Sequence, residues 1–153
     1  MEKIQSFQIN HNILETGFYI SRRDDDIITY DLRTRKPNAG DYMTNIAMHS
    51  VEHMFATFAR NSEIAEDVVY FGPMGCQTGF YFLVKNQKPA DVFELTKKIL
   101  ADIIAYVVEM YGASAIECGN YKNLDLAAAK EECKGYLKVL EAQTNLEFTY
   151  PKE

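Results

Sequence analysis

Apolar, aromatic and β-branched residues gather in two short stretches near the start of the chain, residues 17–21 and 27–32, which indicate β-strands. They flank the acidic run Asp24-Asp25-Asp26, and this arrangement is typical of an antiparallel hairpin. Two further stretches rich in β-branched and aromatic residues, 68–71 and 80–84, lie on either side of a glycine-rich connection. They predict a second antiparallel pair of strands.

Three longer segments repeat their apolar residues at the three- and four-residue steps of an amphipathic helix. We predict helices over residues 42–60, 89–111 and 124–140. The apolar stripe of the second helix is formed by Val92, Leu95, Ile99, Ile103 and Val107. Strands and helices do not alternate regularly, so we predict the α+β class, with an antiparallel β-sheet and helices packed on one face. A doubly wound parallel sheet is the alternative.

The composition limits the class of protein. A chain of 153 residues, 47% hydrophobic and 25% charged, is expected to form a single domain over residues 1–153. It has no apolar run of the about 18 residues that suggest a membrane span. Its first residues lack the apolar core of a signal peptide, so we expect a cytoplasmic protein. The net charge of −6 argues against nucleic acid as a partner, because such binding needs basic residues to neutralise phosphates.

The basic residues form one short cluster, Arg33-Thr34-Arg35-Lys36. We predict that this cluster is a solvated strand end, with binding of an anionic substrate group by one arginine as the alternative. The three cysteines are an odd count, so a disulfide framework is not expected. Their thiols are therefore available for metal binding or catalysis.

The segment His49-Ser50-Val51-Glu52-His53 falls within the first predicted helix. Two histidines four positions apart share one helix face, so their imidazoles can bind one metal ion. Glu52 can lie beside that metal without being a ligand. The order His-x-x-Glu-His reverses that of the zincin helix, and it predicts a divalent metal site with an acid/base carboxylate.

Two of the three cysteines lie in glycine-containing loops. Cys118 is a candidate third ligand, since a His/His/Cys set leaves a fourth tetrahedral position for water or substrate; the alternative is a buried free thiol. Cys76 is a candidate nucleophile or base, because a thiolate near a cation is favoured; the alternative is a turn cysteine that points into the core. Cys133, within the third predicted helix, is predicted to be a packing residue.

Four blocks of sequence, taken in order, resemble the S-ribosylhomocysteine lyase (LuxS) family, and the resemblance extends from about Ser6 to Lys130. The blocks are Ser6-Phe7 and His11-Asn12 with Tyr30-Asp31-Leu32-Arg33 and Pro37-Asn38, then His49-Ser50-Val51-Glu52-His53, then Pro73-Met74-Gly75-Cys76-Gln77-Thr78-Gly79-Phe80-Tyr81, and finally Glu117-Cys118-Gly119.

The resemblance implies a LuxS-like fold, a homodimer with sites at its interface, and one Fe(II) per subunit, with Zn(II) or Co(II) able to substitute. It also implies the roles of eight residues. The metal ligands are His49, His53 and Cys118, the acid/base groups are Glu52 and Cys76, and the substrate-binding residues are Ser6, His11 and Arg33. In such a dimer Ser6 and His11 serve the metal site of the partner.

The reaction that the resemblance implies is cleavage of the thioether of S-ribosylhomocysteine. Two proton shifts move the sugar carbonyl from C1 to C3, with the metal as Lewis acid and Cys76 and Glu52 as proton carriers. A β-elimination then expels homocysteine and leaves 4,5-dihydroxy-2,3-pentanedione, the precursor of autoinducer-2. The implied partner is therefore a small molecule.

The chain departs from the family pattern at three places. Tyr70-Phe71-Gly72 stands where the family commonly has Asp-Ile-Ser, so a carboxylate and a hydroxyl are absent there. Leu124 replaces a frequent His, and Thr34-Arg35-Lys36 lacks a frequent Cys. The implied metal ligands and acid/base residues are all present, so we still expect the activity.

Two other functions compete with a lyase. An inverted-zincin peptidase uses the same His-x-x-Glu-His helix to activate water, with Glu52 as general base. However, its third ligand would be a distal carboxylate rather than Cys118, and Cys76 would have no task. A metal-binding interaction module is the non-enzymatic alternative, with a closed site that serves folding alone.

Overall fold

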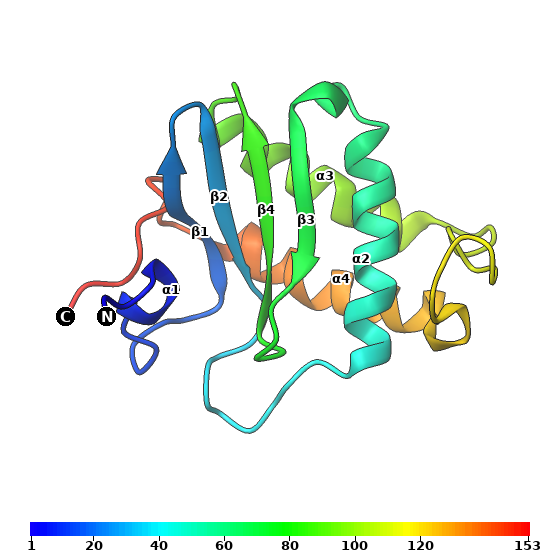
Figure 1. The fold of residues 1–153 in the computed structure, drawn as a ribbon, viewed down its shortest axis with the longest axis horizontal. Helices are drawn as coiled ribbons and strands as arrows, with labels where there is room; N and C mark the ends of the chain where they lie inside the picture. The colour runs from blue at the N-terminus through cyan, green and yellow to red at the C-terminus, as the bar shows by residue number, and fades with distance from the viewer.

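A four-stranded antiparallel sheet forms the centre of the computed structural model, which describes residues 1–153 (Figure 1). The strand order is β1-β2-β4-β3, and the strands are β1 (Gly17–Asp24), β2 (Ile27–Arg33), β3 (Val68–Pro73) and β4 (Gly79–Lys85). Both predicted hairpins are present, and β2 pairs with β4 to join them into one sheet.

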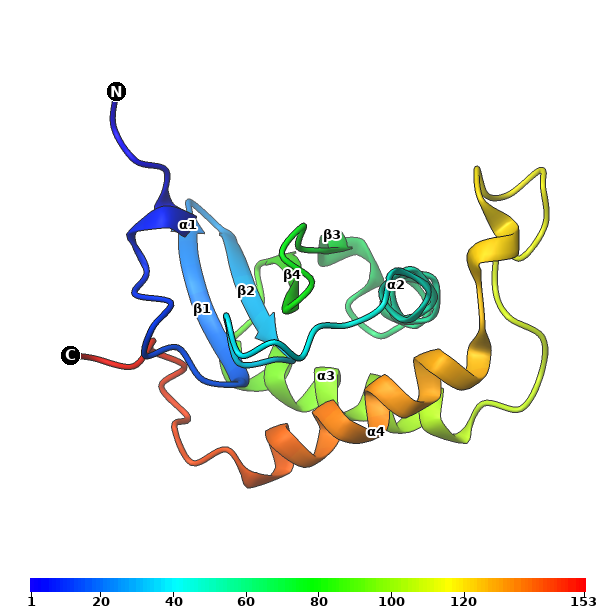
Figure 2. The ribbon, with the colours of Figure 1, turned by 90° about the horizontal axis from the view of Figure 1, so that it is seen from below.

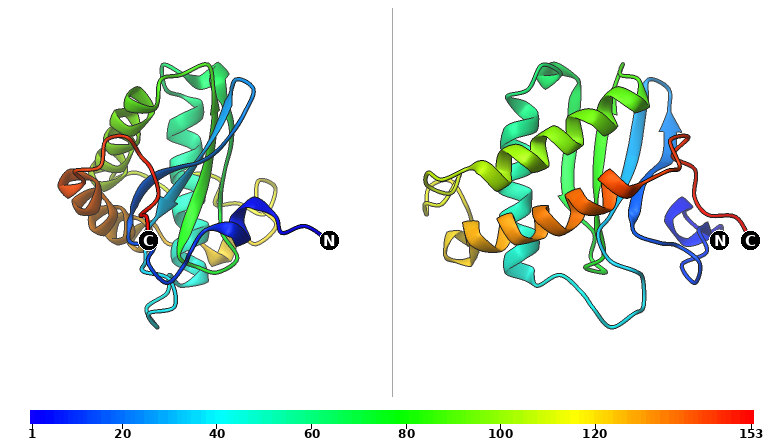
Figure 3. Two further views of the ribbon diagram at one scale, coloured as in Figure 1. Left: turned by 90° about the vertical axis from the view of Figure 1, so that its left-hand side faces the viewer. Right: turned by 180° about the vertical axis from the view of Figure 1, so that it is seen from behind.

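Two long helices cover one face of this sheet, α3 (Pro89–Ala105) and α4 (Leu126–Ala142), as Figure 3 shows from behind. A third, α2 (Asn45–Arg60), lies beside the edge strand β3 (Figure 2). The predicted α+β class, with an antiparallel sheet and helices on one face, is confirmed, and α2 adds a flank at the edge. No helix of the chain is both long enough and apolar enough to cross a membrane.

Short helical turns complete the fold: α1 (Gln5–Gln8), η1 (Ala65–Asp67) and η2 (Tyr121–Asn123). Polar side chains cap two of the long helices. The Thr44 hydroxyl accepts a hydrogen bond from the Ala47 amide at 3.1 Å, and the Asp125 carboxylate accepts one from the Ala127 amide at 3.0 Å. Each cap satisfies a backbone donor that the first turn leaves free, which fixes where the helix begins.

The second predicted helix is too long, because α3 ends at Ala105 and the segment to Tyr111 is not helical. Tyr106 leaves the helix and its ring packs on Tyr111, with the ring centres 5.0 Å apart. Its carbonyl accepts a hydrogen bond from Lys130 Nζ at 2.7 Å. Val107 is therefore 83% exposed and does not extend the apolar stripe. Because α3 ends at Ala105, the segment that follows it is free to turn toward α2.

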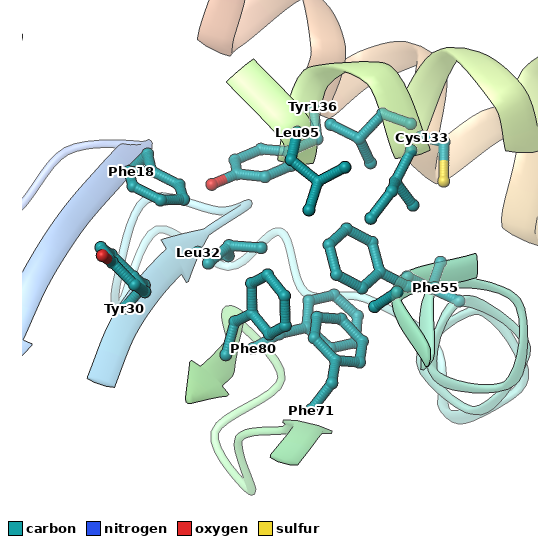
Figure 4. Packing of buried hydrophobic residues seen from close by; sticks show 14 of the residues in the cluster. Phe18, Tyr30, Leu32, Phe55, Phe71, Phe80, Leu95, Cys133 and Tyr136 are labelled. Carbon is teal, nitrogen blue, oxygen red and sulfur yellow. The ribbon is translucent and has the colours of Figure 1, made fainter. Parts of the chain in front are cut away.

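The core lies between the sheet and the helices and contains 26 buried residues (Figure 4). Aromatic rings from three elements stack at its centre. The ring centre of Phe71 in β3 lies 4.2 Å from that of Phe55 in α2 and 5.1 Å from that of Phe80 in β4. Burying each such ring contributes about 1.5–3 kcal/mol. Cys133 is 1% exposed within this core, which confirms its prediction as a packing residue.

The strand β2 is buried on both faces. Tyr30 and Leu32 point into the core, while Asp31 and Arg33, on the other face, are 0% and 2% exposed. The predicted solvated strand end is therefore wrong for Arg33. The reason is that the carboxylate of Asp31 pairs with its guanidinium and compensates for the loss of water.

Candidate metal centre and active site

The two histidines of the sequence motif project from the middle of α2 and meet on one face of the helix. Their ring centres are 4.7 Å apart and the rings are nearly perpendicular. The helix fixes this spacing because residues four apart are neighbours on its surface. His49 and His53 are both half-buried, so each presents one ring edge to a partly enclosed space.

Backbone carbonyls hold both rings in the orientation that metal ligands need. His49 Nδ1 donates to the carbonyl of Asn123 at 3.0 Å, and His53 Nδ1 donates to the carbonyl of Tyr111 at 2.9 Å. A carbonyl only accepts, so each of these contacts places the proton on Nδ1 and leaves the lone pair on Nε2, and the side-chain Nδ2 of Asn123 also lies 3.2 Å from His49 Nδ1. This outer-shell arrangement is typical of histidines that bind metals.

The segment between α3 and α4 carries Cys118 to the histidines. Cys118 Sγ lies 3.5 Å from His49 Nε2 and accepts a hydrogen bond from the amide of Asn120 at 3.4 Å. The ligand atoms of the two histidines and Cys118 all lie within 4.8 Å of one another. Two nitrogens and one sulfur at these separations suit a tetrahedral divalent metal with one open position.

A glycine in the same segment makes room for His53. Gly112 has a φ of +68°, and a Cβ there would lie 2.8 Å from His53 Nδ1. Glycine therefore meets two requirements at this position, a left-handed backbone and a close approach to the ring. The Tyr111 carbonyl can accept the hydrogen bond from His53 Nδ1 only because Gly112 lets this segment come near the ring.

Glu52 lies beside the candidate metal ligands and lines a cavity of about 340 Å³ together with His53, Tyr70 and Tyr111. The Glu52 side chain is half-buried and forms no hydrogen bond within the chain. A carboxylate with no fixed partner, beside a metal-binding cluster, is free to accept or donate a proton. We call this space the metal-side cavity.

Cys76 lies in the turn between β3 and β4, on a second cavity. The Gln77 amide donates to the Met74 carbonyl at 3.0 Å, and this turn leaves Cys76 exposed. The cavity has a volume of about 400 Å³, and Ser6, His11 and Arg33 also line it. The turn cysteine does not point into the core, and we call this space the thiol cavity.

A buried guanidinium faces the thiol. Arg33 Nη1 donates to Thr78 Oγ1 at 2.8 Å and lies 4.0 Å from Cys76 Sγ, which is itself 3.0 Å from Thr78 Oγ1. Burial by itself lowers the pKa of Arg33, but the charge and hydrogen bonds of Asp31 outweigh it, and the pKa is raised. The arginine therefore stays charged beside the thiol of Cys76.

Sequence comparison agrees with this geometry. The sequence model of the S-ribosylhomocysteinase (LuxS) family matches residues 4–146. An S-ribosylhomocysteine lyase of Finegoldia magna is 41% identical over 157 positions, which cover 99% of this chain and 100% of the relative. Those of Desulfotalea psychrophila and Clostridium acetobutylicum are 41% and 38% identical over 158 positions, with 99% of this chain covered in both cases and 99% and 100% of the relatives.

The chain belongs to the LuxS family. The resemblance drawn from the four sequence blocks is thereby confirmed. Membership favours a carbon–sulfur lyase over the peptidase and the interaction module, because neither competing function is found among these relatives.

The structure groups the predicted site residues into two sets. His49, His53 and Cys118 form one cluster, and His53 also lines the metal-side cavity with Glu52. Ser6, His11, Arg33 and Cys76 line the thiol cavity. The two cavities share no lining residue. Within one chain, therefore, the candidate metal ligands and the thiol of Cys76 belong to separate sets.

Several residues that shape the site were not predicted from the sequence. Asp31 and Thr78 hold Arg33, and the hydroxyl of Tyr150 donates to Asp31 at 2.7 Å. The backbone carbonyls of Tyr111 and Asn123 hold the histidines. Of these residues, only Asp31 could have been noticed from the sequence. It is the one carboxylate in a mostly apolar strand, and a buried carboxylate requires a partner.

Proposed function

We propose that the protein is an S-ribosylhomocysteine lyase that cleaves S-ribosylhomocysteine to homocysteine and 4,5-dihydroxy-2,3-pentanedione. The observation that carries the proposal is the His49–His53–Cys118 cluster in a chain of the LuxS family. The relatives from three organisms are named for this activity. The thiol cavity supplies the additional acid/base group that two proton shifts require.

His49, His53 and Cys118 would hold one divalent metal per subunit, and Fe(II) is the proposed metal, with Zn(II) or Co(II) as substitutes. The fit rests on the donor set, on the separation of the three ligand atoms, and on the two Nδ1 protons that leave Nε2 free. When bound, such a metal supplies Lewis acidity toward a carbonyl or hydroxyl oxygen.

Cys76 is the proposed carrier of one proton. Its thiolate removes a proton from a carbon next to the carbonyl, and the thiol returns that proton to the neighbouring carbon. Arg33 supports this cycle because its positive charge, with Nη1 4.0 Å from Sγ, attracts the negative charge that the sulfur carries during the proton transfers. Thr78 Oγ1, 3.0 Å from the sulfur, orients the thiol.

Glu52 is the proposed carrier of the other proton. It lies on the metal-side cavity with no hydrogen-bond partner to compete for its carboxylate. Its proposed task is to move protons between the oxygens of the sugar as the carbonyl migrates. The neutral acid can then protonate an oxygen during the β-elimination that releases the homocysteine thiolate.

Ser6, His11 and Arg33 are the proposed substrate-binding residues. All three line the thiol cavity with Cys76. His11 Nδ1 donates to the carbonyl of Ile9 at 2.8 Å, so its Nε2 is an acceptor available to a sugar hydroxyl. The Ser6 hydroxyl can donate or accept.

We propose a homodimer in which the thiol cavity of one subunit meets the metal cluster of its partner. The support is the separation of the two sets within one chain. Exposed apolar side chains also line these cavities: Phe7, on the thiol cavity, is 69% exposed, and Tyr70, on the metal-side cavity, is 51% exposed. Exposed apolar groups gathered near incomplete sites favour a partner surface there.

We also propose a cytoplasmic location and a single functional domain over residues 1–153. Three free thiols, two of them in the proposed site, favour a reducing compartment. The 26-residue core includes residues from the sheet and from all three long helices, which supports one folding unit.

The test is anaerobic release of free thiol from S-ribosylhomocysteine by the Fe(II)-loaded protein. Cys76→Ala should lower turnover by about 100-fold or more, the effect expected for a lost proton carrier, and should keep its metal. Cys133→Ala is the matched control, because this core thiol is remote from solvent, and its turnover should stay close to that of the native chain. Equal turnover of all three proteins, or none from the metallated native chain, would contradict the proposal.

A further inference from the structure

A continuous chain of hydrogen bonds leads from the C-terminal segment to the thiol cavity. The Tyr150 hydroxyl donates to Asp31 Oδ2 at 2.7 Å. The same carboxylate accepts from Arg33 Nη2 at 2.7 Å and from Arg33 Nε at 3.1 Å. The remaining Nη1 of Arg33 is directed to Thr78 and Cys76. The side chains of Asp31 and Arg33 thus connect Tyr150 to Cys76, the proposed proton carrier.

Asp31 is the central member of this chain, and it is fully buried. Its two oxygens accept three hydrogen bonds, two from Arg33 and one from Tyr150. A buried carboxylate depends on such donors because water cannot replace them. Loss of the Tyr150 hydroxyl leaves Arg33 as the sole hydrogen-bond partner of the Asp31 carboxylate. The orientation of the carboxylate, and with it that of the Arg33 guanidinium, is then less well fixed.

The hydroxyl of Tyr150 is not needed to anchor the C-terminal segment. Phe148 is 3% exposed, packs 5.3 Å from Phe18, and accepts a hydrogen bond from the Ile20 amide at 2.7 Å. The ring of Tyr150 itself stacks on Tyr19, with the ring centres 5.0 Å apart. Packing therefore holds the segment, and the hydroxyl remains available for another role.

We propose that Tyr150 is a positioning residue of the active site, whose hydroxyl fixes the Asp31 carboxylate and, through it, the Arg33 guanidinium that faces Cys76. This inference rests on the proposed role of Cys76 as a proton carrier. Burial, followed by the charge of Asp31, raises the pKa of Tyr150, so the phenol stays protonated and donates at every pH of a lyase assay.

The test compares Tyr150→Phe with Tyr19→Phe in the metal-loaded protein. Tyr150→Phe removes the donor to Asp31 and keeps the stacked ring. Tyr19→Phe removes the hydroxyl of the other ring in the same stack, which donates to the carbonyl of Glu15 at 2.9 Å and not to Asp31. The readout is the rate at which iodoacetamide alkylates Cys76 at pH 7, followed by peptide mass spectrometry, since this reagent reports the thiolate directly.

Tyr150→Phe should slow alkylation about three- to tenfold and lower kcat by a similar factor, less than the ~100-fold expected for a lost proton carrier. Tyr19→Phe should leave both unchanged. In an Arg33→Lys background, Tyr150→Phe should cause no further slowing, because the proposed effect acts through Arg33.

Native alkylation rates in Tyr150→Phe would overturn the proposal, and so would an equal effect in the Arg33→Lys background. A Tyr150→Phe protein that fails to fold would also overturn it, because the hydroxyl would then serve the stability of the fold. Alkylation does not require turnover. If the native protein failed to release thiol, the proposed function would fail while the role of Tyr150 was still decided.

Discussion

The side chain of Tyr70 lies across Gly72, so closely that a Cβ on Gly72 would come within 2.0 Å of the Tyr70 hydroxyl. Both residues lie in the segment where this chain departs from the LuxS pattern of Asp-Ile-Ser. Two positions apart on β3, they share one face of the sheet, and Tyr70 also lines the metal-side cavity with Glu52 and His53. The two departures from the family pattern therefore depend on each other, because Gly72 provides the space that the Tyr70 side chain occupies.

Gly72→Ala should act on the cavity through Tyr70. Tyr70 is half-exposed, so its ring can swing outward, and we expect a stability loss of only about 0.5–1 kcal/mol. The displaced ring should raise KM for thiol release about threefold or more, the size of effect expected when the substrate loses about one contact.

The matched background is Tyr70→Ala. In that variant Gly72→Ala has no ring to displace, and it should leave KM unchanged. A double-mutant cycle in KM measures the coupling between the two positions. Independent, additive effects would show that Tyr70 and Gly72 do not act together.

Gly112→Ala should weaken metal binding although position 112 supplies no ligand. The new Cβ would press on His53 Nδ1 in a backbone conformation that alanine rarely adopts. We expect a loss of metal affinity of about 10- to 100-fold, as for other outer-shell changes, measured by competition with a chelator.

Gly119→Ala is the control for that experiment, because a Cβ at Gly119 has no atom within 4 Å and Gly119 lies next to Cys118. Its metal affinity should match that of the native protein. A similar loss in both variants would indicate a general sensitivity of the segment rather than contact with His53.

Cys118→Ala should lose metal and activity together, since it removes one of three ligands. Metal content measured by elemental analysis should fall well below one per subunit, in contrast to the full content expected of Cys76→Ala. Retention of stoichiometric metal in Cys118→Ala after dialysis would contradict the proposed ligand set.

Two inactive variants should restore activity when they are mixed, provided that they damage different sets of residues. In a heterodimer of Cys76→Ala and His53→Ala, one interface combines an intact thiol cavity with an intact metal cluster. Thiol release should recover in subunits shown to exchange by two different affinity tags.

Cys76→Ala mixed with His11→Ala is the matching control. Cys76 and His11 line the same cavity, so each interface of this heterodimer keeps one damaged residue. We expect no recovery for that pair. Recovery in both mixtures, or in neither despite exchange, would contradict a site shared between subunits in this way.

Tyr30→Phe should stabilise the protein at high pH. The Tyr30 hydroxyl is buried without a hydrogen-bond partner, and burial raises its pKa to about 12. The folded state then holds this proton more tightly than the unfolded chain, so its contribution to stability is complete below pH 10 and is lost as pH rises toward 12. Removal of the hydroxyl should abolish this loss.

At neutral pH the same change should raise the free energy of unfolding by about 1 kcal/mol, because a buried polar group with no partner is removed. Tyr136→Phe is the contrast, since the Tyr136 hydroxyl donates to the carbonyl of Gly17 at 2.8 Å, and its loss should destabilise. Urea unfolding at pH 8 and pH 11 measures both. Destabilisation by Tyr30→Phe at pH 8 would show that the hydroxyl has a partner.

The elements that could be predicted from sequence are those that depend on local periodicity. The two hairpins and α2 follow from patterns a few residues long, and the spacing of His49 and His53 follows from helix geometry alone. The glycine-rich turn at Cys76 is also local. The end of α3 was placed too late because the packing of Tyr106 on Tyr111, which ends the helix, leaves no trace in periodicity.

The sequence by itself determined the hairpins, the spacing of the two histidines on one helix face and, through ordered motif blocks, the resemblance to LuxS. Only the tertiary structure decided that Arg33 is buried against Asp31, that Tyr150 reaches Asp31 from 119 residues away, and that the thiol of Cys76 lies apart from the His49–His53–Cys118 cluster. The physical reason is range. Helix and strand patterns are set by neighbours along the chain, whereas burial and hydrogen bonding of a charged group depend on which distant segments fold against it.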